Sequence, residues 1–273
     1  MEKTKTLADK IHAGRGYDAL VKELLLINPI YYDPHRLWWA WDEKQKIWYN
    51  CDECHIKVII KEKIPLYNDD LVRKGAAIIE ACQIISRKNA PLPFPQHWIQ
   101  YKNAIIDINN GEQHQPSPKY FCVNVIPWNV SEKDDTPTLD KLFSQWVAQE
   151  YVRTLYEIIA YCTYSKYPLH FIFALIGGGR NGKSTFLRIL EKFIGKNNCA
   201  TAVLKQLVLN KNESFGLYQK LVCIIPETTH QNIEDNVMLK QLTGEDLIKY
   251  EKKYADGFTG VNYAKIIMAS NRV

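Results

Sequence analysis

Apolar positions in the first half of the chain recur with two periods, one helical and one extended. Helical spacing in "ALVKELLLI" (Ala19–Ile27) predicts that residues 1–28 are helical, and Asn68–Ser86 predicts a second helix with an Asn or Asp cap. Two aromatic runs around a charged turn in Arg36–Asn50 predict a β-hairpin. An Asn-Gly pair within Asn103–Gln115 predicts another hairpin with a tight turn.

The second half alternates helical patterns with short apolar runs. Leu139–Tyr161 predicts one long helix, and three runs of strand length follow it at Phe171–Ile176, Leu221–Glu227 and Ala264–Asn271. Within Leu239–Gly260, a helix that ends at a glycine is followed by two extended pieces, which predict a hairpin. Alternating strands and helices are typical of an α/β fold with a parallel sheet.

A charged stretch without apolar residues, "SEKDDTPT" (Ser131–Thr138), predicts the boundary between two domains. Residues 1–135 are expected to form a smaller N-terminal α+β domain and 136–165 a linking helix. Residues 166–273 are expected to form the α/β core, a three-layer sheet domain.

A phosphate-binding pattern joins the first of these strands to a helix. Residues 177–184, "GGGRNGKS", fit G-x-x-x-x-G-K-[ST], and an amphipathic run that ends at Gly195 follows them. Glycines let the backbone approach phosphate oxygens, and the helix N-terminus attracts anions. A chance glycine-rich loop is the alternative, but the flanking strand and helix argue against it. The residues expected to bind ATP are Gly177, Gly178, Gly179, Arg180, Asn181, Gly182, Lys183, Ser184 and Thr185.

The chemistry expected at this site depends on a few side chains. Lys183 is predicted to reach the β- and γ-phosphates, and the Ser184 hydroxyl to bind Mg²⁺. Glu227 and Asn271 follow the other two strands, and ligands of open α/β sheets lie at the carboxyl ends of strands. Glu227 is expected to hold Mg²⁺ through water or to polarise the attacking water, and Asn271 to orient that water or sense the γ-phosphate. The alternatives are a solvated strand-end acid and a turn residue.

The hairpin after the second strand carries a group of cations. Lys249, Lys252 and Lys253 alternate with Tyr250 and Tyr254. Basic side chains beside aromatic faces suit single-stranded nucleic acid, which offers phosphates and unstacked bases. An exposed charged hairpin without a ligand is the alternative interpretation.

Composition narrows the class of protein. Residues 1–135 carry 18 basic and 18 acidic side chains, whereas residues 136–273 carry 17 and 12, so the whole net charge of +5 lies in the second half. This excess indicates an anionic partner or simply a solvated basic surface. No apolar run approaches 18 residues and no signal peptide is recognisable, so no membrane partner is expected. The seven scattered cysteines favour reduced thiols and a cytoplasmic location.

Two side signals have plain structural interpretations. "CDECH" (Cys51–His55) has metal-ligand or haem-attachment spacing, but no well-placed second pair accompanies it, and a simple hairpin turn is preferred. Four tryptophans of the first hairpin could stack nucleic-acid bases, but packing within a small sheet is preferred. They are Trp38, Trp39, Trp41 and Trp48.

Four motifs in order, "GGGRNGKST", "LVCIIPET", "LKQLTGEDLIKYEKKY" and "KIIMASN", resemble the superfamily 3 helicases of the phage, plasmid and poxvirus primase–helicase branch. The resemblance covers roughly residues 103–273. It implies an AAA+ P-loop ATPase that uses ATP and Mg²⁺ and unwinds DNA during replication of a virus or plasmid. It also implies a homo-oligomeric ring, usually a hexamer, with a primase or another replication protein as a partner. Lys252 and Lys253 are implied to contact single-stranded DNA, with Lys240 and Asp246 in the preceding motif.

The resemblance also implies an arginine finger, supplied to a neighbouring subunit, that lies beyond Val273. The chain is therefore expected to be C-terminally truncated, to bind ATP and to hydrolyse it slowly unless downstream residues are restored. Two other classes of protein stay open: a different AAA+ motor, such as a packaging ATPase or a remodeller, and a truncated binder of DNA or a replication partner that hydrolyses nothing.

Overall fold

The computed structural model describes residues 17–63, 68–209, 211–226, 237–251 and 257–271. It is a mixed α/β structure that divides into two compact units. The first unit comprises the chain up to Phe94 together with Pro116–Val123, and the second comprises Pro95–Gln115 and the chain from Asn124 onward.

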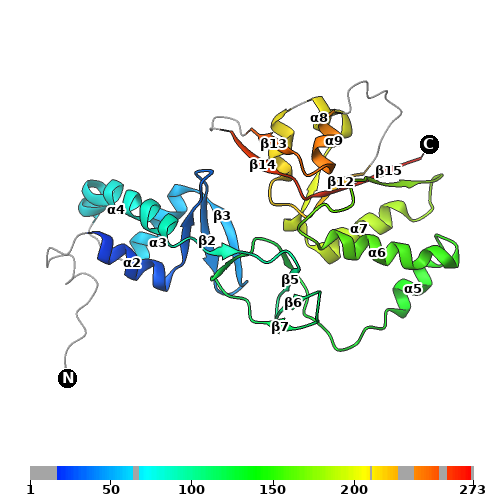
Figure 1. Ribbon diagram of the computed structural model, residues 1–273, viewed down its shortest axis with the longest axis horizontal. Helices are drawn as coiled ribbons and strands as arrows, with labels where there is room; N and C mark the ends of the chain where they lie inside the picture. The colour runs from blue at the N-terminus through cyan, green and yellow to red at the C-terminus, as the bar shows by residue number, and fades with distance from the viewer. Residues whose placement is uncertain (1–16, 64–67, 210, 227–236, 252–256, 272–273) are drawn as a thin grey trace. The chain divides into compact units, whose positions relative to one another are not determined.

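The first unit has α+β architecture, with helices packed against a small antiparallel sheet of order β1-β2-β3 (Figure 1). Its elements are α2 (Tyr17–Ile27), β1 (Ile30–Tyr32), β2 (Trp38–Asp42), β3 (Ile47–Cys51), α3 (Glu53–Lys63), α4 (Asn68–Lys88), β4 (Leu92–Pro93) and β8 (Tyr120–Phe121). The predicted hairpin is confirmed as β2 and β3, and the helices α2 and α4 are confirmed where the structure describes them. The four tryptophans of the hairpin are almost fully buried, so they pack the unit and have no free faces for bases.

The interpretation of Cys51–His55 as a hairpin turn is wrong. Cys51 is the last residue of β3, and Asp52 begins the transition into α3 because its carboxylate accepts the His55 N–H at 2.8 Å. Burial raises the pKa of the Cys51 thiol to about 12. Within the described ranges, no group of three or more His, Cys, Asp and Glu side chains could hold a metal ion.

The second unit is built on a four-stranded parallel sheet of order β10-β15-β12-β11. The sheet and its helices comprise α5 (Pro137–Phe143), η1 (Gln149–Tyr151), α6 (Val152–Cys162), β10 (Phe173–Ile176), α7 (Lys183–Ile194), η2 (Lys196–Asn198), β11 (Cys199–Thr201), α8 (Leu204–Leu209), η3 (Lys211–Leu217), β12 (Val222–Ile225), α9 (Val237–Thr243) and β15 (Lys265–Ser270). A separate hairpin is formed by β13 (Leu247–Tyr250) and β14 (Phe258–Val261). The expected strands and this hairpin are thus confirmed where they are described.

Helices cover both faces of the parallel sheet, which gives three layers. Successive residues of a strand point to opposite faces, and β12 shows this directly. Val222 and Ile224 belong to a core shared with α5, α6 and α7, whereas Cys223 and Ile225 belong to a core shared with α8, α9 and β13. Buried on both sides, the strand reads as a continuous apolar run.

The predicted single helix over Leu139–Tyr161 is wrong, because the chain turns after α5. Trp146 N–H and Val147 N–H both donate to the Phe143 carbonyl, and η1 then leads into α6. The turn lets the two helices pack together: Phe143 is fully buried against the Tyr156 ring, whose hydroxyl lies 2.6 Å from an Asp140 carboxylate oxygen.

The compact units also divide the chain at a different place from the expected boundary near residue 135. A smaller sheet of order β7-β6-β5-β9 belongs to the second unit. Its strands are β5 (Trp98–Tyr101), β6 (Ile105–Asp107), β7 (Gln113–His114) and β9 (Val125–Ile126), and β6 and β7 confirm the predicted Asn-Gly hairpin. Ile126 lies in the core beneath the parallel sheet, and the Asn124 side chain donates to Asn198 Oδ1 at 3.0 Å. Side-chain burial therefore assigns this segment to the second unit.

The first residue of β15, Lys265, has a fully buried side chain. Among the described residues, its Nζ has no hydrogen-bond partner, and the nearest compensation comes from the rings of Tyr161 and Tyr164, whose centroids lie 5.2 and 6.0 Å away. Removal from water lowers the pKa of Lys265 from its ordinary value of 10.5 to about 7. Between these two values the unfolded chain binds one more proton than the folded chain, so stability rises with pH in this window.

Lys265→Met is therefore expected to stabilise the protein, and more so near neutral pH than at high pH. The gain in free energy of unfolding over wild type should shrink by up to about 1.4 kcal/mol for each pH unit above the folded pKa. Urea unfolding of both proteins across this pH range measures the difference. Lys192→Met, at an exposed lysine of α7, is the control and should show no such trend. A gain for Lys265→Met that does not change with pH would contradict this account.

Candidate functional site

The candidate site lies at the carboxyl edge of the parallel sheet. β10 and β15 are paired in parallel from Phe173↔Ile267 to Ile176↔Ser270, so both strands end at the same edge. The Gly177 N–H donates to the Ser270 carbonyl at 3.2 Å, which places the start of the glycine-rich loop beside the end of β15. Asn271 follows Ser270 directly and is exposed. The structure thus brings two of the predicted site segments together.

The loop between β10 and α7 reaches the helix through two residues in the left-handed region. Arg180 has φ 60° and Gly182 has φ 89°, and the Gly182 carbonyl accepts the first bond of the helix, from Phe186 N–H at 2.8 Å. Left-handed backbone is unfavourable for residues with a Cβ, so a glycine suits the second of these positions. The expected amphipathic helix is confirmed as α7, which buries Phe186, Leu187, Leu190 and Ile194.

Lys183 is the first residue of α7, and its ammonium group is held by the loop itself. Its Nζ donates to the carbonyls of Gly177 and Gly178 at 2.6 and 2.8 Å and to Asn181 Oδ1 at 2.7 Å. An ammonium has three donors, and three oxygens of the loop match them. The lysine therefore lies within the concave side of the loop.

The electrostatic character of the loop is positive. The first turn of α7 contains no acidic side chain, so no residue of that turn neutralises the partial positive charge of the helix N-terminus. Arg180 and Lys183 add two cations, and the Ser184 and Thr185 side chains are exposed in the same turn. Anionic ligands with several oxygens suit such a site.

One contact of the loop, with a distant tryptophan, could not be predicted from the sequence. The indole of Trp146, from the turn after α5, covers Gly182 so closely that a Cβ added there would overlap the ring. The indole also packs beside Phe143, with ring centroids 5.6 Å apart. Trp146 thus holds the loop where it enters α7, although it lies in a segment that the apolar pattern assigned to a continuous helix.

Of the other predicted site residues, the structure describes only Lys249. Glu227, Lys252 and Lys253 lie outside the described residues, although the strand before Glu227 is β12, the neighbour of β15. Lys249 is exposed on β13, and its Nζ lies 2.7 Å from Glu251 Oε1. Tyr250 is buried against Tyr218 and Phe258, so its ring offers no free face to a base.

Comparison with known families and structures agrees with this architecture. Residues 19–149 match the family described as D5 N terminal like, and residues 175–273 match a family of unknown function (DUF5906). Two structures of the NrS-1 C-terminal region align with a TM-score of 0.60 and 13% identity, one over 92% of this chain and 56% of its own length, the other over 94% and 58%. At this identity the alignment shows a shared fold, and the chain spans little more than half the length of those structures.

The structure is that of a mixed α/β protein with a parallel sheet, a glycine-rich loop at the edge of that sheet and an N-terminal α+β unit. The chain thus resembles the D5 N terminal like family in residues 19–149 and shares its fold with the NrS-1 C-terminal region. None of the described helices is long and apolar enough to cross a lipid bilayer.

Gly182→Ala is expected to lower the free energy of unfolding by about 1–3 kcal/mol, because the new methyl group meets Trp146 and the backbone is left-handed. Gly178→Ala is the matched control, since a Cβ there meets nothing within 4 Å. That control should change stability by less than about 1 kcal/mol in either direction. Chemical denaturation of the three proteins measures both values, and equal effects of the two substitutions would contradict the described loop.

Proposed function

We propose that this protein is an ATP-dependent DNA helicase that acts in the replication of a virus or plasmid and moves along single-stranded DNA. The observation that carries the proposal is the position of Lys183, held by loop oxygens at the N-terminus of α7 and at the carboxyl edge of a parallel sheet. The primase–helicase resemblance supplies the DNA-directed part of the proposal, and the glycine-rich loop supplies the ATP-directed part.

ATP is proposed to bind across the loop from Gly177 to Thr185, as in P-loop NTPases of the AAA+ class. Lys183 would exchange one or more of its contacts with the loop for oxygens of the β- and γ-phosphates. The backbone N–H groups of the loop and the first turn of α7 would bind the remaining phosphate oxygens. A Cβ added at Gly177 would overlap the Asn181 side chain, so a glycine there leaves room for this compact loop.

Ser184 and Glu227 are the residues proposed to hold Mg²⁺, Ser184 through its hydroxyl and Glu227 through water. The metal ion would neutralise charge on the phosphates during transfer. Asn271 follows β15, beside the start of the loop, and is proposed to orient the attacking water. An arginine from a neighbouring subunit of a ring, a hexamer in the proposed assembly, would complete the site.

The hairpin of β13 and β14 is proposed to contact single-stranded DNA through Lys249, Lys252 and Lys253. The ion pair between Lys249 and Glu251 partly offsets the charge of Lys249, so the two lysines of the tip would contribute more to phosphate binding. Burial of Tyr250 anchors the hairpin in the core of the second unit, which couples its position to that of the sheet.

ATPase assays with and without single-stranded DNA test the function as a whole. A helicase is expected to hydrolyse ATP faster when DNA is present. ATP turnover that does not change when DNA is added would favour another AAA+ motor. DNA binding without any ATP turnover would favour a non-hydrolysing binder.

Lys183→Ala is expected to abolish ATP turnover and leave the fold intact, because it removes the side-chain cation placed for the β- and γ-phosphates. Turnover, nucleotide affinity and the thermal unfolding midpoint are measured together. Lys192→Ala, at an exposed lysine in the last turn of the same helix, is the control and should keep wild-type turnover. Wild-type turnover in Lys183→Ala would remove the loop from the mechanism.

Lys252→Ala combined with Lys253→Ala is expected to weaken binding of single-stranded DNA without loss of ATP binding. Each lost phosphate contact should flatten the slope of log affinity against log salt by about 0.7. Titrations at several salt concentrations measure this slope. A matched double substitution of the exposed Lys61 and Lys63 on α3 should leave the slope unchanged. An unchanged slope in the hairpin variant would place the DNA elsewhere.

A further inference from the structure

The first unit contains a groove that the proposed ATPase chemistry does not use. It has a volume of about 650 Å³ and lies between the C-terminal parts of α2 and α4 and the strand β4. Most of its lining is apolar, and it includes Leu25, Leu26, Ile30, Ile85 and Leu92. A preformed hollow of this size is large enough for a short segment of another molecule.

The walls of the groove are apolar, and several of their side chains have no cover in the described structure. Leu26 on α2 is 83% exposed and Leu92 on β4 is 48% exposed, whereas Ile30 and Ile85 belong to the core beneath. Contiguous exposed apolar surface of this kind marks sites of interaction. The floor is continuous with the core, so an apolar ligand would extend the packing of the unit.

The polar side chains of the groove are already engaged within the protein. Ser86 Oγ accepts the Tyr32 N–H at 3.1 Å, and Asn89 Nδ2 donates to the Ile85 carbonyl at 3.0 Å. Trp48 Nε1 donates to the Tyr120 carbonyl at 3.0 Å, which fixes the indole on one side of the groove. The groove therefore selects its ligand by apolar contact and by charge.

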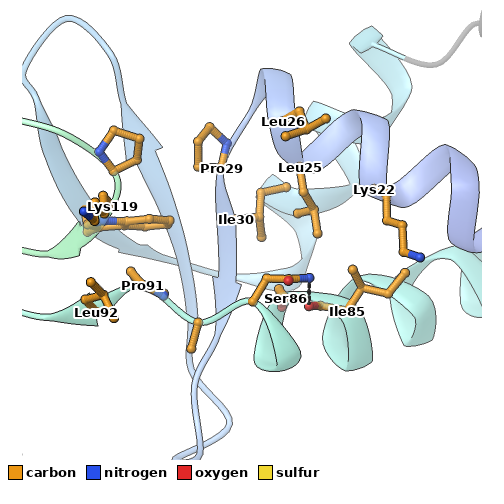
Figure 2. A pocket seen from close by; sticks show the side chains of 14 residues that line it. Lys22, Leu25, Leu26, Pro29, Ile30, Ile85, Ser86, Pro91, Leu92 and Lys119 are labelled. Carbon is orange, nitrogen blue, oxygen red and sulfur yellow. Dashed lines mark hydrogen bonds between the residues drawn. The ribbon is translucent and has the colours of Figure 1, made fainter.

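The charge of the groove is entirely positive. Lys22 and Lys119 lie at opposite ends, as Figure 2 shows, and no acidic residue is among the described residues that line the groove. Neither lysine forms an ion pair with a side chain of the described ranges; Lys119 lies instead over the Tyr120 ring, 5.5 Å from its centroid. An apolar segment with a carboxylate at each end would complement both cations at once.

The groove is also rigid, so little conformational entropy of the protein is lost when a ligand binds. Pro29, Pro91 and Pro118 all line it, and each has a restricted φ. β4 is held in place by β8, through the Leu92 N–H that donates to the Lys119 carbonyl at 2.8 Å. A preorganised site favours binding of a short peptide, whose own ordering is the main cost.

We propose that this groove, from Lys22 to Lys119, docks a short apolar segment of a partner protein that carries acidic residues on both sides of its apolar part. A single anionic headgroup or a lone phosphate would use one lysine and leave the apolar walls uncovered. The proposal rests on the first unit alone and does not depend on ATP or DNA binding.

The test uses a fluorescein-labelled peptide of about ten residues, with leucine and phenylalanine in its middle and aspartate at both ends. Fluorescence anisotropy with the full chain measures its affinity. Two further peptides have lysine ends or a serine middle. The first peptide is expected to bind at least about tenfold more tightly than either of the others.

Two variants locate the binding. Leu26→Ser and Lys119→Glu are each expected to weaken binding of the first peptide by about tenfold or more. Their matched controls are Ile84→Ser, at a half-exposed apolar residue of α4 outside the groove, and Lys61→Glu on α3, and these should change affinity by less than about twofold. Leu26 is almost fully exposed, so Leu26→Ser should keep the wild-type unfolding midpoint.

Several results would overturn the proposal. One is absence of binding up to about millimolar peptide, which corresponds to a free energy weaker than about −4 kcal/mol. Others are equal binding of the lysine-ended peptide, or equal effects of the groove variants and their controls. Binding that develops only after residues 1–16 are removed would assign the groove to the chain's own N-terminus. Self-association that Leu26→Ser abolishes would assign it to a second copy.

Discussion

Strand β15 forms parallel hydrogen-bonded pairs on both sides, with β10 from Phe173↔Ile267 to Ile176↔Ser270 and with β12 from Val222↔Lys265 to Ile225↔Met268. This pairing aligns the carboxyl ends of strands that are far apart in the sequence. The glycine-rich loop leaves the sheet at Gly177, bonded to the Ser270 carbonyl, and Asn271 begins where β15 ends. Every part of the proposed ATP chemistry depends on this shared edge, because residues on separate strands can act on one phosphate only if their strands end together.

The loop at that edge is stabilised by contacts from two directions. From within, the ammonium group of Lys183 joins both ends of the loop through the Gly177 and Gly178 carbonyls and Asn181. From outside, Trp146 packs on Gly182, so a residue of the turn between α5 and α6 contacts the loop where α7 begins. A ligand that draws Lys183 away from the loop oxygens would act on a loop already fixed at Gly182. The buried, unpaired Lys265 lies at the opposite end of β15, where its cost in stability is separated from the site.

The first unit follows a different plan. Its tryptophans are used for packing, and the uncovered apolar surface lies instead between α2, α4 and β4, with a lysine at each end. The two units thus carry different candidate surfaces: a glycine-rich loop with two cations, proposed to bind ATP, in one unit, and an apolar groove, proposed to dock a peptide, in the other.

The local features of this protein were determined by its sequence, because they depend on neighbours in the chain. Spacing of apolar residues predicted α4, α7 and the strands β10, β12 and β15, and the glycine pattern predicted the loop between β10 and α7 with Lys183 at the start of the helix. Tertiary structure decided what depends on contacts between distant residues. The rings of Phe143 and Tyr156 can pack together only because the chain turns where one long helix was predicted. The same turn places the Trp146 indole against Gly182. Tyr250 is buried whereas its neighbour in the sequence, Lys249, is exposed, because successive residues of a strand face opposite sides. The groove, too, is formed by segments around Lys22, Ile85 and Lys119 that no single stretch of sequence contains.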